Sequence, residues 1–138
     1  MSHDPQQYLQ RAVQTATPGQ LVVMLYDGFQ RFTAQARAAF EAGDVGEGGL
    51  KLSRAQAIVT ELRCTLDMSH EPIATNLASI YEWVTQELMA SRMERDVQRL
   101  TRATEQMGEL RASWAQVATT ARPAVESNRP VVGVNLAG

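Results

Sequence analysis

Residues 15–28 read Thr-Ala-Thr-Pro-Gly-Gln-Leu-Val-Val-Met-Leu-Tyr-Asp-Gly, and this stretch decides the fold. Thr17 is a suitable helix N-cap, Pro18 fits the first helical position, and Gln20 completes a capping box with Thr17. Six apolar residues follow without a break, whereas one buried helix face needs only about three or four per two turns. The helix is therefore apolar beyond a single stripe, and the excess must be covered by this chain or by a partner.

Apolar spacing outward from this stretch predicts four long helices. The first spans about 18–42 and ends at Gly43, and the others span about 50–66, 72–93 and 96–121. Long helices joined by short links predict an all-α antiparallel four-helix bundle. We expect its core to include Leu21, Leu25, Leu62, Leu77, Leu110 and Trp114.

Two details of these helices are open to a direct structural check. Gly46, Gly48 and Gly49 weaken the start of the second long helix, so we expect fraying or a loop there, although Asp44 and Glu47 could cap an earlier start. The third long helix buries an apolar stripe that consists of Ile73, Leu77, Ile80, Tyr81, Val84 and Leu88.

The two ends of the chain differ from the middle. Residues 1–16 have an apolar spacing that suits a short amphipathic helix or an extended clasp, which is too short to be stable alone in water. Residues 123–138 are irregular, with two prolines, two glycines and a short apolar patch from Val131 to Leu136. We expect a single bundle domain over 1–122, with 1–16 as its clasp, and a flexible tail over 123–138.

Composition and charge exclude several classes of partner. The 138 residues are 44% hydrophobic but only 6% aromatic, and the net charge is -2, which gives no reason to expect nucleic acid. No apolar stretch approaches the roughly 20 residues of a membrane span, and the chain lacks a signal-peptide pattern. We expect a cytosolic protein without membrane insertion. Basic and acidic residues alternate as on a solvated helix face at Arg92, Glu94, Arg95, Asp96, Arg99, Arg102 and Glu105.

Residues that carry chemistry in helical bundles are missing or badly placed. A di-iron site needs Glu-x-x-His on two helices, but the histidines are His3, near the start, and His70, in a turn. Glu71 and Pro72 beside His70 do not suit a phosphoryl-accepting histidine, and Cys64 has no histidine nearby in sequence to act as a base. We therefore expect no enzymatic activity, no metal and no cofactor.

Surplus apolar side chains stand out instead. Those that fall off the primary stripes are Val23, Met24, Tyr26, Trp83, Met89 and Met93. They either pack under the N-terminal segment and between neighbouring helices, or they line a groove for an amphipathic partner segment. Methionine adapts to irregular partners, and tyrosine and tryptophan offer large contact areas with a polar tip.

Several short motifs occur in a fixed order along the chain. They are Tyr8, Thr15-Ala16-Thr17-Pro18, Leu25-Tyr26-Asp27-Gly28, Glu61-Leu62, Leu66-Asp67, Asn76-Leu77, Tyr81, Asp96, Leu110 and Trp114. In this order and spacing, over about residues 8–120, the chain resembles flagellar export chaperones of the FliS type. The ordered set is specific because the Leu-Tyr-Asp-Gly element lies inside the first long helix.

The resemblance implies a non-catalytic helical bundle that acts in the cytosol. Such a chaperone binds the C-terminal segment of flagellin, prevents premature polymerisation and delivers subunits to the flagellar type III secretion system. Export-gate components are further partners that the resemblance implies, and both a monomer and a homodimer stay open. The N-terminal segment of the family can fold back over the groove when flagellin is absent.

Both lines of reasoning lead to one set of predicted partner contacts, Tyr8, Val13, Met24, Tyr26, Asp27, Asn76, Tyr81 and Trp83. Tyr8 and Val13 would form a displaceable clasp. Asp27 and Asn76 would either fix the register of the partner by hydrogen bonds or tie helices of the bundle together. The alternative function is a generic helical adaptor or dimerisation module without a flagellar role.

Overall fold

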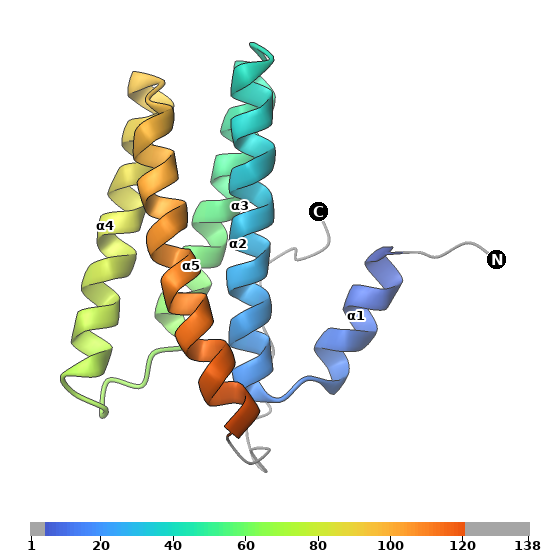
Figure 1. Ribbon diagram of the computed structural model, residues 1–138, viewed down its shortest axis with the longest axis vertical. Coiled ribbons are helices and arrows are strands. Elements are labelled where there is room, and N and C mark those ends of the chain that lie inside the picture. Colours follow the sequence, from blue (N-terminus) through green and yellow to red (C-terminus); the bar gives the residue numbers. More distant parts are fainter. Residues whose placement is uncertain (1–4, 121–138) are drawn as a thin grey trace.

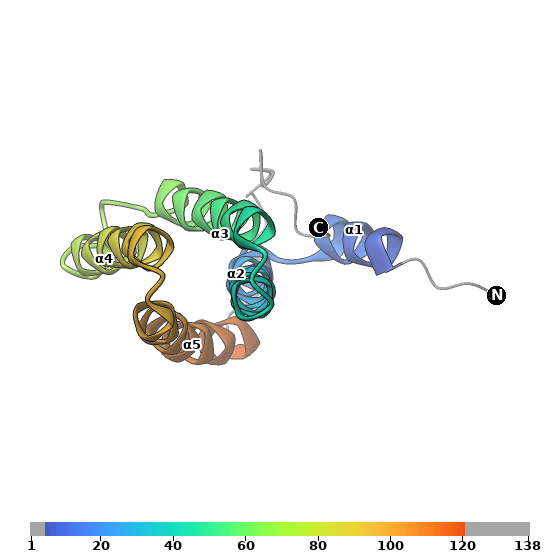
Figure 2. The same cartoon turned by 90° about the horizontal axis from the view of Figure 1, so that it is seen from above.

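Five helices and no strands make up residues 5–120, the part of the chain that the computed structural model describes. A short α1 (Pro5–Thr15) precedes four long helices, which are α2 (Pro18–Glu41), α3 (Val45–Cys64), α4 (Ile73–Glu94) and α5 (Val97–Thr120). Helix α2 packs on α3 and α5, and α4 also packs on both, so the four long helices close into a ring (Figures 1 and 2). This confirms the predicted all-α bundle. The predicted tail over 123–138 lies outside the described residues.

Local capping explains where α2 begins. Thr17 has an extended backbone, and its side-chain hydroxyl accepts a hydrogen bond from the Gln20 amide at 3.2 Å. The Gln20 side-chain oxygen accepts in return from the Thr17 amide at 2.9 Å, with Pro18 at the first helical position. The predicted capping box is therefore confirmed, and it satisfies two amides that the helix itself cannot pair.

The core runs along the inside of the ring and draws on all four long helices. Its buried apolar residues are Leu25, Tyr26, Phe29, Phe32, Ala36, Leu52, Ala55, Ile58, Val59, Leu62, Leu77, Tyr81, Val84, Leu88, Leu100, Ala103 and Met107. Leu25, Leu62 and Leu77 are thus confirmed as core. The other predicted core residues, Leu21, Leu110 and Trp114, are half-buried.

The start of α3 differs from the expected fraying. The helix begins at Val45, and the Asp44 side chain caps it by accepting a hydrogen bond from the Glu47 amide at 3.1 Å. Gly48 and Gly49 are buried inside the helix. A Cβ atom on Gly48 would lie 2.5 Å from the Phe40 ring of α2, and one on Gly49 would lie 3.1 Å from the Arg92 guanidinium of α4. These glycines therefore allow close helix packing, a role that helix propensity alone does not reveal.

Gly46 and Gly48 offer a matched test of this packing. Gly46 is exposed and has only a 3.8 Å contact from its added Cβ, so Gly46→Ala should raise the free energy of unfolding by about 0.5–1 kcal/mol. Gly48→Ala should lower it by about 1–3 kcal/mol, because the Phe40 ring must move. Urea denaturation measures both changes, and an equal gain from both variants would contradict the packing role.

Helix α1 lies beside the bundle, outside the ring of four (Figures 1 and 2). Leu9 and Val13 pack against the core cluster, whereas the Tyr8 side chain is 76% exposed. Of the two forms predicted for this segment, the structure shows the short helix. An isolated helix of this length is marginal in water, so those two apolar contacts hold it against the bundle.

Candidate functional site

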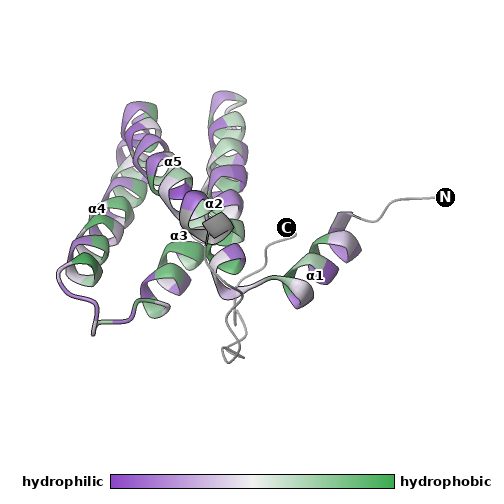
Figure 3. Cartoon of the chain, turned by 60° about the horizontal axis from the view of Figure 1, so that its bottom comes forward, coloured by the Kyte–Doolittle hydropathy of each residue, from purple (hydrophilic) through white to green (hydrophobic). Residues whose placement is uncertain are grey.

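Helices α2 and α4 begin, and α3 and α5 end, at the same end of the bundle (Figure 1). The half of the bundle next to this end contains most of the half-buried apolar side chains that pack against the core cluster. We call this region the open end. Its half-buried apolar residues, all packed against the core cluster, are Leu9, Val13, Val22, Met24, Leu66, Ile80, Leu110 and Trp114. Figure 3 brings this end forward and shows hydrophobic residues on the lower turns of α3 and α4.

Two further apolar side chains at the open end are exposed to solvent. Met68, in the link between α3 and α4, is 54% exposed, and Ile73, the first residue of α4, is 65% exposed. The predicted burial of Ile73 is therefore wrong, because α4 starts at this residue and no preceding turn covers it. Ile80 is half-buried, whereas the rest of the predicted stripe of α4 is buried.

Tyr26 and Tyr81 lie beneath the open end instead of on its surface. Tyr26 is fully buried, Tyr81 is 1% exposed, and their hydroxyl oxygens are 2.5 Å apart. Tyr26 was expected to point away from the core stripe of its helix, and this expectation is wrong. Helix α2 packs between α3 and α5, so it buries a face wide enough to include Tyr26. Direct contact of either ring with a partner is not possible in this conformation.

Burial controls the ionisation of this pair. It is the largest cause that raises the pKa of both hydroxyls above the ordinary value of 10.0. For Tyr26 the neighbouring Tyr81 raises the pKa further, and the Trp114 indole acts in the opposite direction. The two hydroxyls therefore stay neutral and share one hydrogen bond that joins α2 to α4.

This pair predicts a loss of stability in alkali. Because the folded state raises both pKa values, its stabilising contribution is complete below pH 10.0 and is lost as the pH rises above that value. The melting temperature of the wild type should therefore fall more steeply above pH 10.0 than that of the double variant Tyr26→Phe, Tyr81→Phe. Parallel melting curves across pH 8–11 for the two proteins would contradict this assignment.

The remaining predicted contact residues differ in exposure. Val13 and Met24 are half-buried at the open end, whereas Tyr8 and Asn76 are exposed. Trp83, on the outer side of α4, is 37% exposed. The structure therefore places Val13 and Met24 among the residues of the open end, and it leaves the other three exposed.

Asp27 has a partner within the bundle. The Arg111 Nε atom donates to its carboxylate at 2.6 Å, and a second guanidinium nitrogen lies 3.5 Å from the other oxygen. This pair ties α2 to α5 beside the open end and raises the pKa of Arg111. Of the two roles predicted for Asp27, the structure shows the tie between helices. Sequence reasoning missed Arg111, since its partner is 84 positions away.

No group of three or more His, Cys, Asp and Glu residues within the described range is arranged to hold a metal ion. His70 contacts Asp67 at 3.3 Å in an exposed turn, and Cys64 is exposed. No helix of that range is long and apolar enough to cross a membrane.

Comparison with known proteins points to one family. The model of the family described as "Flagellar protein FliS" matches residues 1–121. A protein of Bacillus subtilis (strain 168) named "Flagellar secretion chaperone FliS" is 30% identical over 115 residues, which are 83% of this chain and 86% of that protein. A protein of the same name from Salmonella typhimurium is 31% identical over 115 residues, 82% of this chain and 85% of the relative. The "Flagellar secretion chaperone FliSB" of Pseudomonas aeruginosa is 28% identical over 107 residues, 77% of this chain and 85% of that protein.

Proposed function

The chain belongs to the FliS family of flagellar secretion chaperones and is not an enzyme, and from this premise we propose that its client is the C-terminal segment of flagellin. The proposed task is to hold this segment in the cytosol, to prevent premature polymerisation and to support delivery to the flagellar type III secretion system. Components of the export gate are further proposed partners.

The apolar open end is the observation that carries this proposal. A segment that later forms the core of a filament is amphipathic and lacks its final contacts before assembly, so it needs an apolar surface supplied by another protein. Half-buried aliphatic side chains such as Met24 and Leu66, next to the exposed Met68 and Ile73, offer such a surface. A client that folds as it binds loses conformational entropy, and a large apolar interface can offset that loss.

The proposed contacts follow from exposure. Met24 and Trp83 supply apolar contact, and the exposed amide of Asn76 can pair with the client backbone. Asp27 reaches the client only by sharing its carboxylate with Arg111. Tyr26 and Tyr81 act indirectly, by fixing the spacing of α2 and α4 under the site.

Titration of this chain with the C-terminal segment of flagellin from the same organism tests the proposal. We expect saturable binding, a gain of helix by circular dichroism and a negative heat-capacity change by calorimetry. Absence of binding at high micromolar concentration, for the segment and for full-length flagellin alike, would favour the adaptor alternative.

The clasp predicts a kinetic effect. Tyr8 and Val13 lie on α1, and the Leu9 and Val13 side chains of this helix pack against the core cluster, so removal of residues 1–16 should uncover apolar surface. We expect brighter fluorescence of an apolar dye and faster association with the flagellin segment, measured by stopped flow. If the truncated protein matches the full chain in both measurements, α1 does not gate the site.

A further inference from the structure

A cavity of about 210 Å³ lies at the end of the bundle opposite the open end. We call this region the hairpin end, because the turn between α2 and α3 and the turn between α4 and α5 both lie there (Figure 1). Apolar walls come from three helices, with Phe40 on α2, Val45 on α3, and Val97 and Leu100 on α5. Ser91 on α4 adds a hydroxyl that is already bonded to the Leu88 carbonyl at 2.8 Å.

The walls of this cavity are held in place. Leu100 is 1% exposed and belongs to the core, and the Phe40 ring rests on the backbone of Gly48. At the mouth, Val45 and Val97 are 43% and 37% exposed. An engineered apolar cavity of about 150 Å³ in another protein takes up benzene, so a cavity of this size can hold a large apolar side chain.

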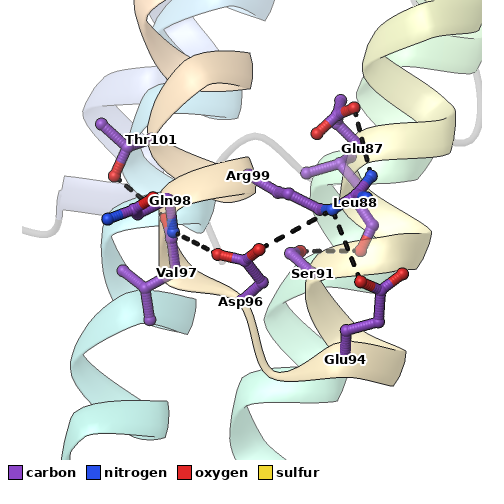
Figure 4. A network of polar contacts seen from close by, with 9 residues as sticks. All are labelled: Glu87, Leu88, Ser91, Glu94, Asp96, Val97, Gln98, Arg99 and Thr101. Carbon is purple, nitrogen blue, oxygen red and sulfur yellow. Dashed lines mark hydrogen bonds and ion pairs between the residues drawn. The ribbon is translucent and has the colours of Figure 1, made fainter.

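Some charged side chains at the mouth of the cavity have a partner of opposite charge, and others do not. Asp96 accepts a hydrogen bond from the Gln98 amide at 3.0 Å and pairs with Arg99 at 3.8 Å (Figure 4). Arg99 also pairs with Glu87 and Glu94, so carboxylates near the α4–α5 turn balance its positive charge. Arg95, which lines the same mouth, has no carboxylate partner among the described residues. A cation is thus available beside an apolar cavity.

We propose that the hairpin end docks a protein partner other than the flagellar client, through one large apolar side chain flanked by a carboxylate. The apolar side chain fills the space between Phe40, Val97 and Leu100, and the carboxylate pairs with Arg95. Glu41 lines the α2 side of the mouth and repels a carboxylate there, so the carboxylate of the partner lies on the α4–α5 side. This site is separate from the open end, so the two partners can bind together.

Arg95 allows a variant that removes the charge without harm to the fold. Its backbone is left-handed, with φ 53°, and it ends α4. Asparagine adopts this conformation more readily than arginine, so Arg95→Asn should fold at least as well as the wild type. Arg95→Lys keeps the positive charge, and Val97→Trp closes the mouth of the cavity. Leu50→Trp, at a site 47% exposed on α3 outside the cavity, is the control for an added tryptophan.

The probe is a short alanine-based helical peptide that carries one phenylalanine and one glutamate a turn apart, followed through the methyl NMR signals of Val45 and Val97. We expect saturable shifts, with affinity about two- to fivefold weaker for the glutamine form of the peptide or for Arg95→Asn, as for one partly exposed ion pair. Arg95→Lys and Leu50→Trp should bind as the wild type does, and Val97→Trp should lose at least tenfold.

Three results would overturn the proposal. One is the absence of saturable methyl shifts with the peptide. Another is equal binding by Val97→Trp and Leu50→Trp, which would place the peptide outside the cavity. The last is binding of 3-phenylpropionate without binding of the peptide, which would indicate a small-molecule pocket. Val97→Trp should bind the flagellin segment as tightly as the wild type does. A negative result with the peptide would therefore overturn the hairpin-end site without contradicting flagellin as the client.

Discussion

Replacement of Tyr26 by alanine is expected to lower the free energy of unfolding by about 3–5 kcal/mol, as for other large aromatic residues truncated in a core. The ring is fully buried on α2, and its hydroxyl interacts with Tyr81 of α4 and Trp114 of α5, so its removal leaves a cavity in the core. It also leaves the Tyr81 hydroxyl buried without its partner. Domains of this size are stable by about 5–15 kcal/mol, so the variant should be close to unfolding at 37 °C, as measured by urea denaturation.

Phenylalanine variants separate the hydrogen bond from the ring. Tyr26→Phe keeps the volume but orphans the Tyr81 hydroxyl, which should cost about 1–3 kcal/mol. The double variant Tyr26→Phe, Tyr81→Phe removes both polar groups and should be more stable than the sum of the two single variants predicts. Additive losses in this cycle, or a mild effect of Tyr26→Ala, would show that the pair is not coupled as the structure indicates.

Much of the fold could be predicted because it follows from local signals. The Thr17 and Gln20 capping box fixes the start of α2, and Gly43, with φ 81°, ends the turn after it. Three- and four-residue spacing correctly identified buried residues such as Leu25 and Leu62. Each of these signals acts within a few positions of the chain, so a sequence pattern can detect it.

Two of the errors have one physical cause, which is packing between helices. Gly48 weakens a helix in isolation, yet here it makes room for Phe40 of another helix. Tyr26 lies outside the face that α2 would bury if it packed against a single helix, whereas α2 packs against two helices. Helical periodicity alone contains neither the number of neighbouring helices nor the distance between their axes, so Tyr26 was placed off the core, whereas Tyr81 is buried as its stripe predicted.

The candidate site was predictable in kind but not in detail. Six consecutive apolar residues correctly signalled more hydrophobic surface on α2 than one stripe buries, and Met24 does line the open end. Ile80 was assigned to the buried stripe of its helix, yet Ile80 and Leu66 are both half-buried at the open end. Their partial exposure depends on where the bundle ends and on which helix crosses it, and these are properties of the assembled structure.

Ile73→Asp should reduce affinity for the flagellin segment roughly 30- to 1,000-fold, which corresponds to about 2–4 kcal/mol. The side chain is 65% exposed in the free protein, next to the half-buried residues of the open end. If the client covers it, a carboxylate at this position loses its water without gaining a partner, and the binding free energy decreases accordingly. Isothermal titration calorimetry with the wild-type flagellin segment measures the change.

Because of the position of Ile73, a loss of affinity in Ile73→Asp would not result from unfolding of the variant. It is the first residue of α4, where an aspartate interacts favourably with the helix dipole, so the variant should melt no lower than the wild type. Met93→Asp is the matched control, because Met93 lies near the other end of the same helix and is 80% exposed. Loss of binding by Ile73→Asp but not by Met93→Asp would locate the client at the open end. Equal affinities for both variants would mean that the client binds elsewhere on the bundle, even though the chain belongs to a chaperone family.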